Sequence, residues 1–261
     1  MNEIMPNSAL LGKEDLIQRI TCKSEKRIFI SPILSSKQIQ PASIDVRLGP
    51  EFLVFKTGKI THLEPLRSPN EVRKEVQSYI EKYKILERYD TFILHPDEFV
   101  LGCTLEYVCL PTDIAGRLEG RSSWGRLGLL IHATAGFIDP GFRGNITFEL
   151  KNMGKIPIPL YPGIRIGQLA FFNILNNNSY CGKYQESFGI VPSEYFIDEE
   201  YDIIRKRCTP DYYENIVMEI FNDVENNKGL PILNHPYLTK DLIDSIATAY
   251  KRKYDQNIGD D

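Results

Sequence analysis

The sequence has 261 residues, enough for one sizeable domain with an appendage or for two small domains. A domain of this size buries about 70–75% of its unfolded surface, so it needs neither disulfides nor a structural metal. The formal net charge of −4 argues against a general nucleic-acid-binding protein, because such proteins usually carry a basic excess.

Cysteine usage and hydropathy indicate a reduced, cytoplasmic protein. The five cysteines are odd in number, and no pair has C-x-x-C spacing. The start, MNEIMPNSALLGKEDL, lacks a basic segment followed by an apolar one. No apolar run approaches the ~18 residues of a membrane span. We therefore expect free thiols, no membrane insertion and no nucleic-acid partner.

In chain order, the first predicted element is a short helix over residues 8–20, where apolar residues recur near helical spacing. From about Ile28 to Asn173 the pattern is mostly β, with short apolar runs broken by Pro and Gly. The main runs are IFISPI, SIDVRL, EFLVF, TFILHP, EFVLGCTLEYVCL, GLLIHATA, NITFELKN and IRIGQLAFF. Many short strands with frequent turn signals are typical of a barrel or a jelly-roll-like sandwich.

A helical insertion is predicted within this β region. Ser68 occupies an N-cap position, Pro69 the first helical position and Glu71 the third, which together form a capping-box start. Apolar residues follow at helical spacing, which predicts a helix over about residues 69–88, ending before Thr91 opens the next strand.

Residues 199–261 are predicted to form a helical extension of the domain at 1–198. Thr209-Pro210 can start one helix, which Asn227-Lys228-Gly229 would end, and Thr239 can cap a second. The pattern does not indicate what this extension does.

The run EGRSSWGRLGLL, residues 119–130, offers donors for a phosphate chain. Arg121 supplies a guanidinium, and Ser122 and Ser123 supply hydroxyls and backbone N–H groups in a turn. Arg126 lies five residues beyond Arg121 and could reach the same anion or a base. The alternative from the residues alone is a polar surface turn capped by its own serines.

Two carboxylates follow this run. Asp139 precedes Pro140-Gly141, a turn signature in which an Asp can simply form an Asx-turn. Residues 145–151 alternate, so Glu149 leaves the face that carries Ile146, Phe148 and Leu150. An isolated Glu at such a position is usually a solvated face residue, and the alternative is that it enters a cleft.

Several ordered motifs resemble the dCTP deaminase branch of the dUTPase superfamily. Residues 119–173 carry the strongest resemblance. PASIDVRLGPEFLVF resembles an early strand motif of that family, PGIRIGQLAFF resembles a late strand with a Gln, and KYQESFGIVPS resembles its Lys-Tyr-Gln segment. The resemblance covers most of residues 8–193 and implies a distorted β-barrel or jelly roll with short helices.

The resemblance implies a role for each matching residue. Arg121, Ser122 and Ser123 would hold the triphosphate, and Arg126 would help to orient the catalytic water. Glu149 would be the general acid/base, Ala135 would lie against the base, and Asp139 would contact the deoxyribose above Phe142. Residues expected to close over the nucleotide are Gln168, Tyr180 and Lys183. The implied substrate-binding set is completed by Trp124, Gly125, Thr147 and Phe148.

The chemistry agrees with these residue types. Deamination adds water at C4 of cytosine and expels ammonia, and a carboxylate can take the water's proton and return it to the ring or to the leaving amine. Zinc deaminases carry a P-C-x-x-C signature, which is absent here. We therefore expect no zinc, and magnesium that enters bound to the substrate phosphates.

The run TAGFIDPGF, residues 134–142, resembles the bifunctional branch that forms dUMP, because Gly136 stands where dUTP-forming enzymes carry a histidine. A monofunctional deaminase, a dUTPase and a catalytically silent regulator are the alternatives. Trp124 and the pair Glu186-Ser187 depart from the family pattern. The resemblance also implies a homotrimer with each active site between subunits.

Overall fold

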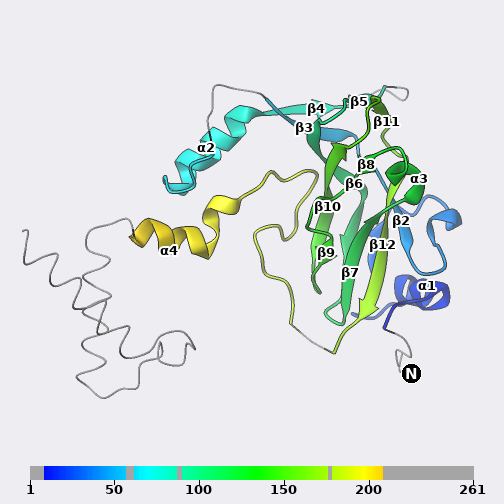
Figure 1. Cartoon of the computed structure of the whole chain (residues 1–261). Coiled ribbons are helices and arrows are strands. Elements are labelled where there is room, and N and C mark those ends of the chain that lie inside the picture. Colours follow the sequence, from blue (N-terminus) through cyan, green and yellow to red (C-terminus); the bar gives the residue numbers. More distant parts are fainter. Residues whose placement is uncertain (1–8, 57–61, 87–89, 176–177, 208–261) are drawn as a thin grey trace, which may run out of the picture. The chain divides into compact units, whose positions relative to one another are not determined.

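The computed structural model describes residues 9–56, 62–86, 90–175 and 178–207 (Figure 1). The chain divides into two compact units, each described here by itself. The first unit comprises Met1–Leu63 with Arg73–Glu194, and the second comprises Glu64–Val72 with Tyr195–Asp261. All the predicted site residues belong to the first unit.

Strands dominate the first unit, as the sequence predicts. A six-stranded antiparallel sheet has the order β4-β3-β6-β10-β8, with β1 also paired to β6. A four-stranded sheet has the order β2-β12-β7-β9, and β11 pairs with β5 in a small third sheet. Strand bounds are β1 Phe29–Ser31, β2 Ile44–Arg47, β3 Glu51–Phe55, β4 Ile80–Lys84, β5 Phe92–Leu94, β6 Phe99–Cys109, β7 Ile114–Gly120, β8 Leu129–Leu130, β9 Phe137–Ile138, β10 Arg143–Asn152, β11 Ile158–Leu160 and β12 Arg165–Asn173.

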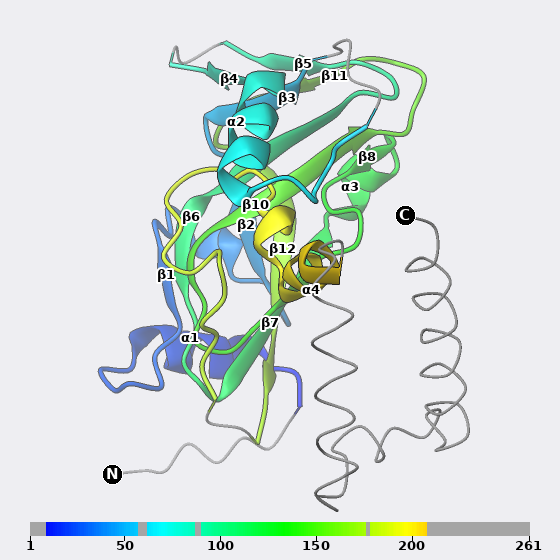
Figure 2. The ribbon, with the colours of Figure 1, turned by 90° about the vertical axis from the view of Figure 1, so that its left-hand side faces the viewer.

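The two larger sheets share one hydrophobic core. Buried residues of β3 and β10, such as Phe52 and Phe148, belong to the same cluster as Ile44 of β2 and Phe171 of β12. Figures 1 and 2 show the long strands β6, β7, β10 and β12 running along one direction, with α1 near one end and β4, β5 and β11 at the other. The mainly β prediction of a distorted barrel or jelly roll is confirmed.

The predicted N-terminal helix exists and is shorter than expected. Helix α1 spans Lys13–Thr21, and the N–H of Gly12 donates to the Asp15 carboxylate at 3.2 Å at its start. Leu16 packs in the core, and the buried Arg19 pairs with Asp113 at 2.9 Å. An ion pair beneath the helix thus fixes it to the residues that precede β7.

The predicted insertion helix starts where expected and ends early. Helix α2 spans Pro69–Tyr79, and Ser68 N–H donates to the Glu71 carboxylate at 3.2 Å, as a capping box requires. Residues 80–84, predicted as helix, form β4 instead and pair with β3. Backbone pairing and contacts of Lys82 and Lys84 with Glu51 outweigh the local helical spacing.

The second unit contains η2, Tyr195–Ile197, and helix α4, Glu199–Arg207. Arg205 holds this unit together by donating to the carbonyls of Pro65, Arg67 and Phe196. The helices predicted from Thr209 and Thr239 lie outside the described residues, and the domain boundary at 198 stays a prediction. No helix in the described part of the chain is long and apolar enough to cross a membrane.

Candidate active site

The alternation predicted for residues 145–151 is confirmed on β10. Ile146, Phe148 and Leu150 are buried, whereas Thr147 and Glu149 are only partly so. Phe148 is fully buried in the hydrophobic core, so its side chain packs away from the face that carries Glu149. The strand therefore presents a carboxylate on a face that the core does not cover.

The Glu149 carboxylate is fixed by the loop that connects β8 and β9. Its Oε2 atom accepts hydrogen bonds from the backbone N–H groups of Ala133 at 2.6 Å and Thr134 at 3.4 Å. The Glu149 N–H donates in turn to the Ile131 carbonyl at 2.9 Å. Side chain and backbone of one residue thus hold the loop that carries Ala135 and Gly136 against β10.

Glu149 lines a cavity of about 340 Å³. Six predicted site residues meet there, namely Ala135, Asp139, Phe142, Thr147, Glu149 and Tyr180. Its other lining residues are Leu101, Phe137, Ile138, Asn145, Ile146, Tyr184, Ser187, Val191 and Ser193. An acidic group on β10 and a second on the turn before β10 line one cavity, an arrangement suited to proton transfer on a ring-sized ligand.

The Asp139 turn is closed by the backbone. Phe142 N–H donates to the Asp139 carbonyl at 3.2 Å, and Gly141 has a φ of 78°, which favours glycine. Within the described chain no group donates to the Asp139 carboxylate, so the turn is not an Asx-turn and this side chain is exposed at the cavity.

A C-terminal segment completes the cavity. Tyr180 N–H donates to the Pro140 carbonyl at 2.8 Å, and the Tyr180 and Phe142 rings lie 6.2 Å apart. Gln185 joins this segment to the Asp139 turn: its amide nitrogen donates to the carbonyls of Gly141 at 2.8 Å and Tyr180 at 3.2 Å. Its amide oxygen accepts from Arg143 N–H at 2.9 Å.

Sequence reasoning missed several residues of the cavity. Asn145 lies on the same face of β10 as Glu149, so the alternation itself could have identified it. Tyr184 and Ser187 also line the cavity and lie in the KYQES segment, of which only Lys183 was predicted as a site residue. Lys183 does not line the cavity; its Nζ donates to the Glu194 carbonyl at 3.3 Å and lies 5.3 Å from the Tyr184 ring centre.

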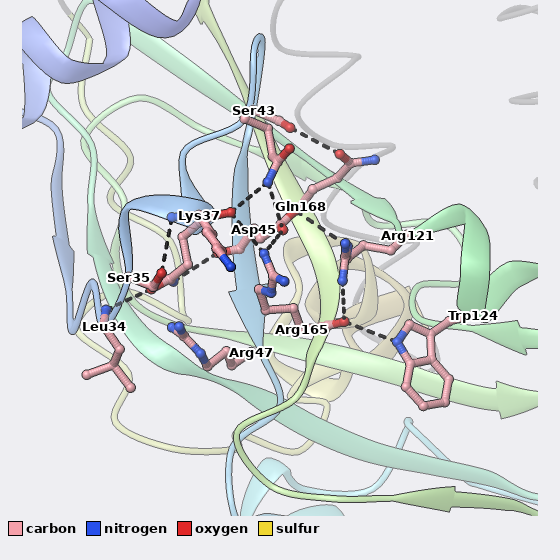
Figure 3. A network of polar contacts seen from close by, with 12 residues as sticks. Leu34, Ser35, Lys37, Ser43, Asp45, Arg47, Arg121, Trp124, Arg165 and Gln168 are labelled. Atoms are coloured by element: carbon pink, nitrogen blue, oxygen red, sulfur yellow. Dashed lines mark hydrogen bonds and ion pairs between the residues drawn. The ribbon is translucent and has the colours of Figure 1, made fainter.

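The predicted phosphate-binding residues form a separate group. The short helix α3 spans Ser122–Gly125 and is followed directly by Arg126. None of these five residues lines the Glu149 cavity. Figure 3 shows Arg121, Trp124 and Gln168 beside Asp45 and Arg165. Arg121 Nη1 and Trp124 Nε1 both donate to the Arg165 carbonyl, at 3.3 and 3.1 Å.

Gln168 on β12 belongs to this second group. Its amide oxygen accepts from Ser43 Oγ at 3.0 Å, and its nitrogen donates to the Gly120 carbonyl at 3.3 Å, directly before Arg121. Apart from Lys183 and the buried Phe148, the predicted site residues therefore divide between the cavity and the surface around α3 and β12.

Metal-binding side chains do not gather in the described residues, where no group of three or more His, Cys, Asp or Glu could hold an ion. The tripeptide His62-Leu63-Glu64 matches the H-x-E half of the zinc-deaminase signature. The C-x-x-C half is missing from the whole sequence.

Comparison with known proteins gives consistent matches. A family model for dCTP deaminase-like domains matches residues 10–174. A protein of Corynebacterium kroppenstedtii named "dCTP deaminase, dUMP-forming" is 47% identical over 176 residues, 65% of this chain and 89% of that one. One of the same name from Rhodococcus jostii is 43% identical over 196 residues, 72% and 97% of the two chains.

Among solved structures, the 2′-deoxycytidine 5′-triphosphate deaminase from Agrobacterium tumefaciens matches with a TM-score of 0.49 and 19% identity, over 65% of this chain and 49% of that chain. The family match covers more than half of the sequence and includes the strands that carry Glu149 and Gln168 and the turn that carries Asp139. This chain belongs to the dCTP deaminase-like family.

Proposed function

We propose that this protein deaminates dCTP at C4 of cytosine and cleaves the product between the α- and β-phosphates, releasing ammonia, dUMP and pyrophosphate. Relatives that share 43–47% of their residues over nearly their whole length carry the name "dCTP deaminase, dUMP-forming". The observation on which the proposal rests is the Glu149 carboxylate, fixed by the loop before β9 and facing a cavity of about 340 Å³.

Glu149 acts as the general acid/base. One of its oxygens, Oε2, is occupied by two backbone N–H groups, whereas Oε1 accepts no hydrogen bond from the described residues. We assign Oε1 to the attacking water. Glu149 takes a proton as the water oxygen bonds to C4 and delivers it to N3; it then transfers the remaining proton of the new C4 hydroxyl to the amino group as C4=O forms. The C4–N bond then breaks and ammonia leaves.

The phosphate-binding group acts from a neighbouring subunit. Ser122, Ser123 and Arg126 are exposed and do not line the cavity of their own chain. We therefore propose a homotrimer in which α3 of one subunit supplies Arg121, Ser122, Ser123 and Arg126 to the cavity of the next. Light scattering tests this assembly: a fully active protein that stays monomeric at micromolar concentration would exclude it.

Formation of dUMP needs a second water near the α-phosphate, which we assign to Asp139. A Cβ atom at Gly136 would lie 3.0 Å from the Leu118 carbonyl and 3.2 Å from His132 Cε1, so a histidine at this position requires His132 to move. Magnesium accompanies the substrate, held mainly by its phosphate oxygens. Activity is expected to survive zinc chelation and to depend on magnesium.

Incubation with dCTP and magnesium, followed by chromatography of nucleotides and assays for ammonia and pyrophosphate, tests the proposal. The expected products are dUMP, ammonia and pyrophosphate in equal amounts. Accumulation of dUTP without pyrophosphate indicates a monofunctional deaminase, and turnover of dUTP alone indicates a dUTPase. Binding without turnover indicates a nucleotide-dependent regulator.

A further inference from the structure

The first unit carries a second cleft, of about 540 Å³, that is distinct from the Glu149 cavity. The two share no lining residue. The second cleft is lined by Lys13, Ile17, Ser36, Lys37, Ile39, Gln40, Pro41, Arg121 and Arg165. Its volume falls within the range of about 300–1,000 Å³ that is usual for small-molecule sites.

Positive charge converges on this cleft from four places in the chain. Lys13 begins α1, Lys37 lies in the 3-10 helix Ser36–Gln38, Arg121 precedes α3 and Arg165 begins β12. Among the described residues that line the cleft, none carries a carboxylate. Four like charges around one depression repel one another, and a bound anion relieves that repulsion.

Asp45 holds the two guanidinium groups in place (Figure 3). This buried carboxylate lies 2.9 Å from Arg165 Nη1 and 3.6 Å from Arg121 Nε. Arg165 Nη1 also donates to the Lys37 carbonyl at 2.9 Å, which fixes the backbone that carries Lys37. The single negative charge of Asp45 is thus shared by two arginines. With Lys13 and Lys37 added, the groups at the cleft carry a net positive charge.

The apolar lining of the cleft comprises Ile17, Ile39 and Pro41. Ile17 and Ile39 are partly accessible, whereas Ser36 and Gln40 add polar groups next to the cations. Such a site favours a multiply charged anion over a neutral ligand, because four cations line it and Asp45 holds two of them in place.

We propose that this basic cleft binds a polyphosphate, with Lys13, Lys37 and Arg165 as contacts additional to Arg121. The inference rests on the proposed function in one respect: Arg121 precedes α3, so the cleft continues the surface assigned there to the triphosphate. The anion is then either the terminal phosphates of the nucleotide or the pyrophosphate that the reaction releases.

The test is a calorimetric titration of the full-length protein with inorganic pyrophosphate, without nucleotide. The double variant K13Q/K37Q removes two charges whose side chains are exposed, leaving Asp45 and both arginines intact. Loss of two surface charges near a polyanion is expected to weaken the pyrophosphate Kd by about tenfold or more. The control K23Q/K155Q changes the net charge equally at exposed lysines outside the cleft and should leave the Kd within about twofold.

The proposal is overturned if the wild-type protein binds no pyrophosphate, or if K13Q/K37Q binds it as tightly as wild type. It is also overturned if the control variant K23Q/K155Q loses as much affinity as K13Q/K37Q. The KM for dCTP identifies the source of the anion. A KM that rises with the pyrophosphate Kd assigns the cleft to the substrate's own phosphates, and an unchanged KM assigns it to a separate anion. Because the titration needs no turnover, its result stands apart from any failure to deaminate dCTP.

Discussion

The carboxylate of Glu149 accepts a hydrogen bond from the backbone N–H of Ala133 at 2.6 Å. The acceptor lies on β10, and the donor lies in the loop that leads to β9, sixteen residues earlier in the chain. This contact gives the carboxylate one fixed orientation without an arginine or lysine partner in the described structure. One oxygen therefore positions the group, and the other is left for chemistry.

Glu149→Gln should retain the fold and lose deamination. The amide oxygen of Gln has the same shape and can still accept from Ala133 N–H, so the loop before β9 should keep its place. The variant cannot take a proton from water, and ammonia release should fall by about 10²-fold or more. Circular dichroism and dCTP binding serve as controls, and near-normal ammonia release would rule out the assigned role.

Gln185→Ala should raise the KM for dCTP more than it lowers kcat. The wild-type side chain joins the Tyr180 segment to the turn of Asp139 and Phe142 through three hydrogen bonds of 2.8–3.2 Å. Because net hydrogen-bond contributions are about 1 kcal/mol each and water can replace some of them, we expect a KM increase of about tenfold.

The matched control is Gln18→Ala, at an exposed position on α1. It should change neither KM nor the melting temperature. If Gln185→Ala lowers the melting temperature but leaves the KM as in wild type, Gln185 stabilises the fold without positioning the cavity wall.

The sequence was sufficient to predict the strands and the face on which Glu149 lies, because both follow from local alternation along β10. It was insufficient for residues 80–84, which have helical spacing but pair with β3, a partner 25 or more residues earlier. Pairing across such a distance depends on the assembled sheet, which a local pattern does not contain.

Six residues of the cavity were predicted from the sequence, but the separation of the predicted residues into two groups was not. Residue types and motif order indicated both Glu149 and Ser122, yet only Glu149 lines the cavity of its own chain. Gln185 was missed because its function lies in three contacts with backbone groups, which no side-chain pattern records.

Glu51→Gln should lower the free energy of unfolding at neutral pH. In acid, the wild-type protein and the variant should be equally stable. Glu51 lies 3.0 Å from Lys82 and 3.4 Å from Lys84 across the β3–β4 pair. The hydrogen bond from Lys82 is the main reason that the pKa of this carboxyl lies below its ordinary value of 4.5. A lowered pKa in the folded state stabilises the fold above pH 4.5, and the contribution disappears as the pH falls through the lowered pKa.

Chemical denaturation at pH 7 and at several acid pH values measures the difference in free energy of unfolding between wild type and Glu51→Gln. For such a pair this difference is about 1 kcal/mol or less at pH 7. Glu81→Gln is the control, since it removes the pair between Glu81 of β4, 45% accessible, and Lys56 directly after β3, 53% accessible. A Glu51→Gln effect that is independent of pH would show that packing, not charge, accounts for it.

Asp139→Asn should weaken pyrophosphate release more than ammonia release. Asp139 is the second carboxylate of the cavity, on the turn before β10, and no described group donates to its side chain. Attack at the α-phosphorus needs a positioned water and relief of charge on the phosphate oxygens. Asp139 can position the water, and Ser122, Arg126 and magnesium can relieve the charge on the phosphate oxygens. Asn keeps the size of the side chain and removes its charge, so the fold and the Glu149 chemistry should persist.

Early time points with dCTP distinguish the two steps. The wild-type protein should give dUMP and pyrophosphate with little free dUTP, whereas Asp139→Asn should accumulate dUTP while ammonia release continues. Glu25→Gln, at an exposed position outside the cavity, is a control that also removes one carboxylate and should give the wild-type product pattern. If both steps slow equally in Asp139→Asn, the residue binds the sugar and does not direct the second water. If wild type itself accumulates dUTP and never yields pyrophosphate, the chain is a monofunctional deaminase and Gly136 has another reason to lack a side chain beside His132.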